Sequence, residues 1–141
     1  MIRRAPALIV AGALALAGCR LELLREHPLG CRSDEQTLVR DTLYFGSDIP
    51  GGGRVDDSAW QAFEHDRLGP AFPQGYTVLA AAGHWRDASG KDSAESSRIV
   101  LIVHRDDADA AQRVRRVAQA YRERFKQESV LRERSTVCAQ F

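Results

Sequence analysis

The sequence feature that most constrains the fold is a short run, residues 99–103, in which every side chain is apolar. A strand with one solvated face alternates apolar and polar residues, whereas a strand covered on both faces does not. The segment 96–105, which contains this run, is therefore predicted to be a strand in the centre of a sheet.

Three other segments predict strands of the same sheet. Residues 38–46 and 76–85 are rich in types that favour extended structure; the first stops at Gly46 and the second follows Gly75. Residues 128–141 carry charged side chains within a strand-like stretch, including Arg132, Glu133 and Arg134. Charges of this kind are typical of an edge strand that must not pair with other chains.

Two helices are predicted between these strands. The first begins at Asp56, a suitable N-cap, with Val55 before it and Trp60 four positions inside the helix. It is expected to end at Gly69-Pro70. The second begins among the aspartates at 106–109, and its apolar side chains recur every three or four residues, namely Ala111, Val114, Ala118, Tyr121 and Phe125.

The resulting order, β-α-β-β-α-β, predicts a ferredoxin-like fold of the α+β class. This fold is a four-stranded antiparallel sheet with two helices on one face. It places the third strand in the centre and the last strand at an edge beside the first. The apolar third strand and the charged last strand fit those positions.

The N-terminus has the pattern of an export signal. Arg3 and Arg4 precede residues 5–18, which carry no charge and are too few to span a bilayer. The stretch ends at Cys19 and resembles the lipobox of bacterial lipoproteins, in which this cysteine is acylated. The alternative is an ordinary signal peptide with an incidental cysteine.

The lipobox resemblance implies three parts of the chain and a location. Residues 1–18 would be the signal peptide, 19–36 a lipidated tether and 37–141 the folded domain. Acyl chains on Cys19 would anchor the protein to the membrane of the bacterial envelope. Arg20 stands where an aspartate often retains lipoproteins in the inner membrane, so the outer membrane, facing the periplasm, is expected.

Charge and cysteine content narrow the partners. The full chain has 20 basic and 19 acidic residues, so a mature chain without Arg3 and Arg4 would have 18 against 19. A near-neutral domain argues against a nucleic-acid partner.

The cysteines allow one disulfide in the folded domain. Lipidation of Cys19 leaves Cys31 and Cys138 as a pair that the predicted topology brings close enough to form a disulfide. The alternative is two separate thiols.

The glycine-rich loop 46–53 raises the question of nucleotide binding. Gly46 and Gly51 have the first spacing of a phosphate-binding loop, but Gly52 and Gly53 replace its lysine and hydroxyl residue. Asp56 stands at the start of the helix, where it would repel phosphate. We therefore expect a connecting loop and no nucleotide at Gly51–Gly53.

Few residues suggest chemistry. The histidines lack the spacing of metal ligands, so no metal and no cofactor are expected. His84 and Arg86 end the second predicted strand, Glu95 follows after a loop, and Tyr44 could face the same surface. Together these four could hold an acidic ligand or perform acid–base chemistry. The alternative is a solvated strand end.

Several short pieces of the chain, from about residue 40 to residue 141, resemble the domain of unknown function 3574 family, a family of small bacterial exported proteins. The resemblance supports the limits of the domain and its envelope location, and it implies no reaction. The pieces are Leu43 to Gly46, Trp60 with Phe63, Pro70 with Phe72 and Pro73, Gly75 with Thr77 and Val78, Gly83 with Trp85, Glu95 with Ser97, Tyr121, Phe125, and Gln127 with Ser129 to Leu131.

Two functions are consistent with these residues. The first is a non-enzymatic envelope lipoprotein whose domain binds an envelope protein or a small ligand, or pairs with a second copy through its sheet. The alternative is a small dimeric ferredoxin-like enzyme or ligand-binding protein that uses Tyr44, His84, Arg86 and Glu95 in a cavity beside the sheet. No catalytic residue is predicted.

Overall fold

The computed structural model describes residues 30–86 and 90–141. The predicted signal peptide and Cys19 lie outside these residues. The elements, in chain order, are β1 (Gln36–Gly46), α1 (Asp57–Phe63), the π-helical turn η1 (Glu64–Leu68), α2 (Gly69–Ala71), β2 (Thr77–Arg86), β3 (Asp92–His104), α3 (Ala108–Phe125) and β4 (Leu131–Ala139).

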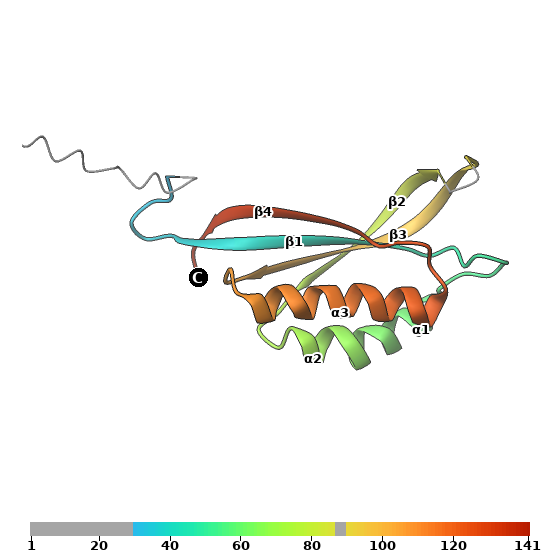
Figure 1. Cartoon of the computed structure of the whole chain (residues 1–141), viewed down its shortest axis with the longest axis horizontal. Coiled ribbons are helices and arrows are strands. Elements are labelled where there is room, and N and C mark those ends of the chain that lie inside the picture. The colour runs from blue at the N-terminus through green and yellow to red at the C-terminus, as the bar shows by residue number, and fades with distance from the viewer. Residues whose placement is uncertain (1–29, 87–89) are drawn as a thin grey trace, which may run out of the picture.

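The strands form one antiparallel sheet in the order β2-β3-β1-β4, and the helices cover one of its faces (Figure 1). The ferredoxin-like α+β prediction is confirmed, including the central place of the apolar third strand and the edge position of the last. The other face of the sheet, the open face, carries no helix of the described chain.

The core lies between the sheet and the helices. Val100 and Ile102 of β3 and Leu43 and Phe45 of β1 are buried there. Their alternate neighbours, such as Tyr44 and Ile99, point to the open face, since successive side chains of a strand alternate between faces.

An aromatic cluster fixes the end of β1 to α3. The ring of Tyr121 lies 4.7 Å from that of Phe45 and 5.1 Å from that of Phe63, between centroids. Burial raises the pKa of the Tyr121 hydroxyl, which stays protonated and donates to the carbonyl oxygen of Gly46 at 2.8 Å. The last residue of β1 is therefore held in place from the helical layer.

The helix starts follow the predicted capping. The Asp56 side chain accepts a hydrogen bond from the backbone N–H of Ala59 at 2.8 Å, and Val55 and Trp60 are both buried. At the second helix, the N-cap is Asp107, whose side chain accepts from the backbone N–H of Ala110 at 2.6 Å. These bonds satisfy backbone donors that a helix start leaves unpaired.

The end of the first helix differs from prediction. Gly69 and Pro70 do not end it; they form its last turn, which closes at Phe72. The N–H of Gly69 reaches back five residues to the carbonyl of Glu64, so one turn is widened. Leu68, the last residue of this turn, is fully buried in the core cluster that also contains Phe63.

Strand β3 begins four residues earlier than predicted. Asp92 pairs with Arg86 and Glu95 pairs with Gly83, so the hairpin of β2 and β3 projects well beyond the helices (Figure 1). Glu95 therefore belongs to the strand and not to the preceding loop. Sequence patterning missed this extension because residues 92–97 have few apolar side chains.

A buried ionic cluster crosses the helix-facing side of three strands. Asp41 of β1 is fully buried, and Arg132 of β4 donates to both of its carboxylate oxygens, at 2.7 and 3.0 Å. Nε2 of His104 lies 2.8 Å from Oδ2 of Asp41. The expectation that Arg132 faces solvent and keeps the edge strand from pairing with other chains is therefore wrong, because its guanidinium binds the buried Asp41.

The cluster sets the charge state of Asp41. Burial by itself would raise the pKa of Asp41, but the hydrogen bonds from Arg132 and His104 outweigh it and hold the pKa below its usual value. Asp41 is thus a buried carboxylate with a cation fixed against it.

The predicted disulfide is present. Cys31 and Cys138 are bonded, with Cα atoms 5.5 Å apart and 107 positions between them in sequence. Because Thr37 of β1 pairs with Cys138, the bridge joins the segment before β1 to the end of β4.

Among residues 30–86 and 90–141, no helix is both long enough and apolar enough to cross a membrane.

Candidate functional site

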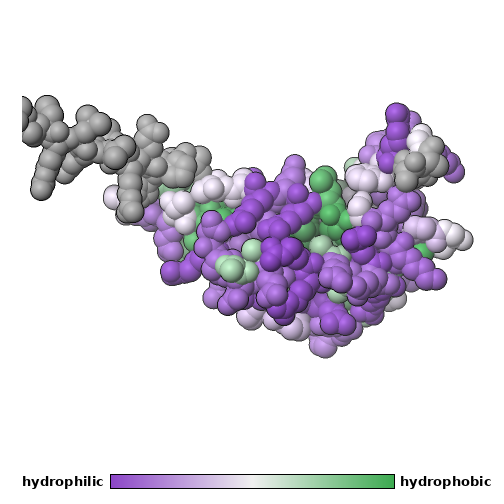
Figure 2. Space-filling view, in the orientation of Figure 1, coloured by the Kyte–Doolittle hydropathy of each residue, from purple (hydrophilic) through white to green (hydrophobic). Residues whose placement is uncertain are grey.

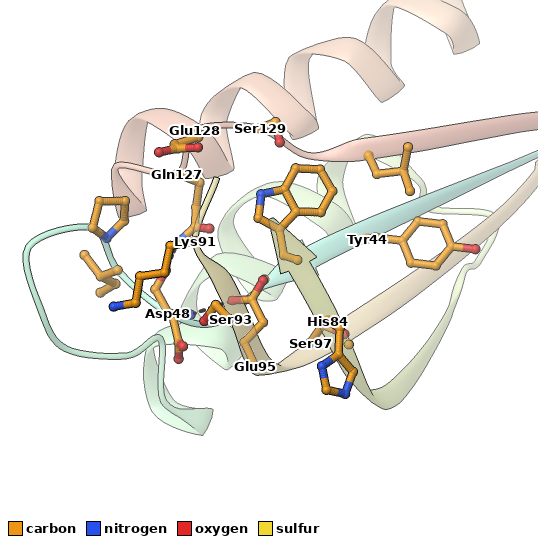
Figure 3. Close-up of a pocket in the computed structure, with 16 residues that line it drawn as sticks. Tyr44, Asp48, His84, Lys91, Ser93, Glu95, Ser97, Gln127, Glu128 and Ser129 are labelled. Carbon is orange, nitrogen blue, oxygen red and sulfur yellow. Dashed lines mark hydrogen bonds between the residues drawn. The ribbon is translucent and has the colours of Figure 1, made fainter. Parts of the chain in front are cut away.

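A cavity of about 460 Å³ lies where the projecting β2–β3 hairpin meets the end of β1 and the turn before β4 (Figure 3). Its lining comes from four parts of the chain. These residues are Tyr44, Gly46, Asp48, Ile49, Pro50, Gly83, His84, Trp85, Lys91, Ser93, Glu95, Ser97, Gln127, Glu128, Ser129 and Leu131.

The floor of the cavity consists of very small residues around Glu95. Gly83 stands directly opposite Glu95 on β2, and Ser93 and Ser97 flank it on the same face of β3. Gly46 of β1 pairs with Ser97. A sheet surface built of glycine and serine is hollow, and this hollow leaves the longer Glu95 side chain as the main group on the floor.

The carboxylate of Glu95 is held in a fixed position. Its Oε2 accepts a hydrogen bond from the backbone N–H of Asp48 at 3.1 Å. The carboxylate lies directly over Gly46, because a Cβ atom added at that glycine would stand 2.5 Å from Oε1. Gly46 therefore provides the space that the carboxylate occupies.

Apolar side chains form the walls. Trp85 pairs with Ser93, so it is a diagonal neighbour of Glu95 on the same sheet face. Its side chain is 44% exposed, and that of Leu131, across the cavity, is 47% exposed. Figure 2 shows apolar surface gathered at the base of the projecting hairpin.

Tyr44 lines the cavity, but its hydroxyl group is engaged elsewhere. It donates to Oε2 of Glu133 at 2.7 Å, and this hydrogen bond raises the pKa of Tyr44. Figure 3 shows the hydroxyl directed away from Glu95. Tyr44 therefore contributes its ring, and not its hydroxyl, to the cavity.

His84 and Arg86 do not join Glu95 in one reactive group. Strand alternation sends His84 to the face opposite Trp85, and its ring points away from the carboxylate of Glu95 in Figure 3. Arg86 lies beyond the cavity and donates to both oxygens of Asp92, at 2.7 and 3.0 Å. Of the four predicted residues, the cavity collects Tyr44, His84 and Glu95 in its lining, and only Glu95 presents its polar group on the floor.

The glycine-rich loop forms one rim of the cavity. Gly51, Gly52 and Gly53 have φ angles of 90°, 112° and 97°, a region that favours glycine. The loop closes by a hydrogen bond from the N–H of Ile49 to the carbonyl of Gly53, at 3.1 Å. Ile49 and Pro50 thereby reach the cavity, a role that the sequence had not suggested. The absence of a nucleotide at this loop stays a prediction.

Charge in the lining is mainly negative. Asp48, Glu95 and Glu128 carry carboxylates and Lys91 carries an ammonium group. Asp48 is partly compensated by Arg54, whose Nε lies 3.2 Å from Oδ1. In Figure 3, Lys91 extends toward the rim and away from the carboxylate of Glu95.

Sequence reasoning missed most of the cavity. A usable signal existed in residues 93–97, where Ser93, Glu95 and Ser97 alternate on one face of a strand. A single long carboxylate between two serines, opposite a glycine, is the pattern of a shallow polar pocket. The contribution of residues 127–131 depends on folding and has no local signal.

Within residues 30–86 and 90–141, one group of side chains has the spacing of metal ligands. Sulfur atoms of Cys31 and Cys138 and a carboxylate oxygen of Glu35 lie within 4.8 Å of one another. The two cysteines are bonded to each other, and disulfide sulfurs are not thiolate ligands. The group therefore does not form a metal site in this state.

Three comparisons place the chain among known proteins. The model of a family described as "Protein of unknown function (DUF3574)" matches residues 40–141. No curated protein matches the sequence. Among solved structures, a phage SAM lyase in complex with S-methyl-5'-thioadenosine is similar at a TM-score of 0.59 and 17% identity, covering 74% of this chain and 90% of that one. The apo state gives a TM-score of 0.55, with the same identity and coverage. At this identity the likeness shows the fold alone.

Proposed function

Since the chain belongs to the DUF3574 family, whose members are of unknown function, we propose its role from its own residues: it is an exported lipoprotein whose domain binds a small ligand in the cavity around Glu95. The anchor is Cys19 and the domain faces the periplasm from the outer membrane. The domain binds its ligand without transforming it.

The cavity is the observation that carries this proposal. It holds about 460 Å³, within the usual range for small-molecule sites, and it combines apolar walls with a few fixed polar groups. The position of Glu95 is set by a backbone hydrogen bond and by the space over Gly46. A polar group fixed before the ligand arrives costs little ordering on binding.

The orientation of the polar groups favours binding over catalysis. The enzymatic alternative would use Tyr44 or His84 beside Glu95, with each group within hydrogen-bond reach of one substrate. In the described lining, Tyr44 is bonded to Glu133 and His84 points away from Glu95. That alternative would require one of these side chains to turn toward the floor.

The neighbouring fold gives limited support. The solved SAM lyase was obtained with S-methyl-5'-thioadenosine, so a similar arrangement of strands and helices can accommodate a small molecule.

The lipid anchor has a direct test. Cells expressing the full chain are fed an alkyne-bearing fatty acid, and the protein is examined for the label, with Cys19→Ser as the variant and Cys31→Ser as the matched control. We expect the label in the wild type and in Cys31→Ser, and its loss in Cys19→Ser. An unlabelled wild-type protein would indicate an ordinary signal peptide.

Ligand binding is tested by recovering the occupant. The full-length protein is purified from its own envelope in mild detergent and examined by native mass spectrometry, beside Trp85→Ala. We expect a bound small molecule in the wild type and a reduced amount in the variant. Equal recovery of the same molecule from both proteins would place binding outside the cavity.

A second role, self-association, is supported by the open face of the sheet. Leu79, Ile99, Tyr44 and Leu131 form one row across all four strands, and Leu79 and Leu131 are 48% and 47% exposed. Arg40 and Glu133 supply opposite charges on the same face. A patch with apolar residues and both charges can pair with its own copy about a twofold axis.

The self-association proposal predicts a concentration-dependent dimer in sedimentation. Leu79→Lys should shift the population to monomer, whereas Gln112→Lys, on the exposed side of α3, should leave it unchanged. A wild-type protein that stays monomeric at high concentration, or a dimer that survives Leu79→Lys, would contradict it. Co-purification of a different protein that competes with self-association would assign the face to that partner.

A further inference from the structure

We propose that the ligand of this cavity carries a positively charged ammonium group, which lies between the carboxylate of Glu95 and the ring of Trp85. The inference rests on the proposed function, since it names the chemical class that the same cavity accepts. It reverses the sequence-based expectation of an acidic ligand.

The cavity lining is mainly negative. The acidic-ligand expectation depended on Arg86, but Arg86 is bonded to Asp92 through two hydrogen bonds and lies outside the lining. The floor instead presents Glu95, and the rest of the lining carries two more carboxylates, those of Asp48 and Glu128, against one cation, Lys91. An anion entering this cavity would meet like charge on its floor.

The carboxylate of Glu95 is held by a hydrogen bond from the backbone. The N–H of Asp48 donates to Oε2 of Glu95 at 3.1 Å, and the carboxylate occupies the space over Gly46, where no side chain stands. A carboxylate accepts several hydrogen bonds, through about four lone-pair positions on its two oxygens. Glu95 therefore retains acceptor capacity for a cationic donor from the ligand.

Trp85 supplies an aromatic wall beside Glu95. Trp85 is a diagonal neighbour of Glu95 on the same sheet face, and the residue is 44% exposed. The indole ring is the side chain that attracts cations most strongly through its π face, and quaternary ammonium ligands are commonly bound this way. Gly83 stands directly opposite Glu95 and two residues before Trp85 on the same sheet face, and it adds no side chain there.

The test titrates the full-length protein with choline, with n-butylamine and with dimethylbutanol, the neutral carbon isostere of choline. Tryptophan emission is the readout. The other tryptophan, Trp60, is 4% exposed and lies in the core, so a change in emission reports chiefly on Trp85, as Trp85→Phe verifies. The two amines distinguish a quaternary from a primary ammonium group.

We expect at least one amine to bind about tenfold or more tightly than the isostere. Glu95→Gln should remove this preference, while Glu123→Gln, which changes a carboxylate on α3 outside this cavity, should retain it. Gly46→Ala is a second variant. It keeps every charged and aromatic group but pushes the Glu95 carboxylate aside, so it should weaken amine binding in a folded protein.

Different failures have different meanings. If the isostere or acetate binds as tightly as the amines, or if Glu95→Gln leaves the preference intact, the cationic class is wrong although the cavity still binds. If none of these probes and no small-molecule fraction of the envelope changes the emission of Trp85, both this inference and the proposed binding function are wrong.

Discussion

Arg132 donates two hydrogen bonds to the carboxylate of Asp41, at 2.7 and 3.0 Å, although 91 positions separate the two residues in the chain. The pair joins β1 to the edge strand β4 on the side of the sheet that the helices cover. Arg132, with Nε2 of His104 at 2.8 Å from the same carboxylate, pairs with a fully buried acid. Its removal would leave that charge buried without its main partner.

Replacing Arg132 should therefore destabilise the domain strongly. We expect Arg132→Met to lower the free energy of unfolding by about 3–5 kcal/mol, the range for breaking one side of a buried ion pair. Arg134→Met, two residues along the strand, removes a pair with the exposed Asp106 and should cost less than about 1 kcal/mol. Urea unfolding compares the two. Equal losses would show that burial of Asp41 does not set the cost.

Acid should weaken the fold through Asp41. The pKa of Asp41 is lowered in the folded state. The stability that ionised Asp41 contributes to the fold is therefore complete above its unfolded pKa near 3.8, and it is lost as the pH falls through the folded pKa. We expect the free energy of unfolding to fall below about pH 4, and to fall less steeply in Asp41→Asn. Urea unfolding across this pH range measures whether the free energy of unfolding falls as the pH is lowered. An identical pH profile in Asp41→Asn would assign the acid sensitivity to other carboxylates.

The disulfide should stabilise the domain through the length of chain that it closes. Cys31 and Cys138 are 107 positions apart, so the bond restricts nearly all of the described chain when it is unfolded. We expect reduction, or Cys31→Ser with Cys138→Ser, to cost about 2–4 kcal/mol. Thermal unfolding with and without reductant measures this difference. A reductant effect that persists in the double variant would point to another cause.

Two glycines on the cavity floor should respond differently to alanine. At Gly83 a Cβ atom would lie 3.8 Å from Oγ of Ser97, an ordinary contact, so Gly83→Ala should be neutral or stabilise the strand by up to about 1 kcal/mol. Gly46→Ala should displace the Glu95 carboxylate and lose its bond to the N–H of Asp48, at a cost of about 1 kcal/mol. Urea unfolding of both variants measures the difference. A Gly46→Ala protein as stable as Gly83→Ala would show that the carboxylate moves freely.

Much of the fold could be predicted because its signals are local. The doubly apolar run in β3, the N-cap at Asp56 and the turn residues each act within a few positions of the chain, and the order of elements then restricts the sheet topology. The widened turn of η1 and the early start of β3 could not be predicted. Both depend on packing and pairing with distant segments, and not on the intrinsic preferences of the residues involved.

The candidate site was less accessible to prediction. Closeness in sequence suggests that His84, Arg86 and Glu95 act together, but the pairing of β2 with β3 puts Glu95 on the sheet face of Gly83 and Trp85, opposite His84, and Asp92 engages Arg86. The cavity depends instead on an absence of side chains at Gly46 and Gly83, which belong to different strands. Sequence patterning records which side chains are present, whereas a hollow arises from small residues that the fold brings together.

The two tryptophans allow the most direct test of ligand binding. We expect two indole N–H signals in a nitrogen-15 NMR spectrum of the full-length protein, one for each tryptophan, and the small molecules of the envelope, or the amine that binds, are then added. We predict that the Trp85 signal shifts in a saturable way while the signal of the buried Trp60 stays in place, and that Glu95→Gln abolishes the shift. A ligand that binds without moving the Trp85 signal, or that moves only Trp60, would contradict a binding site at Glu95.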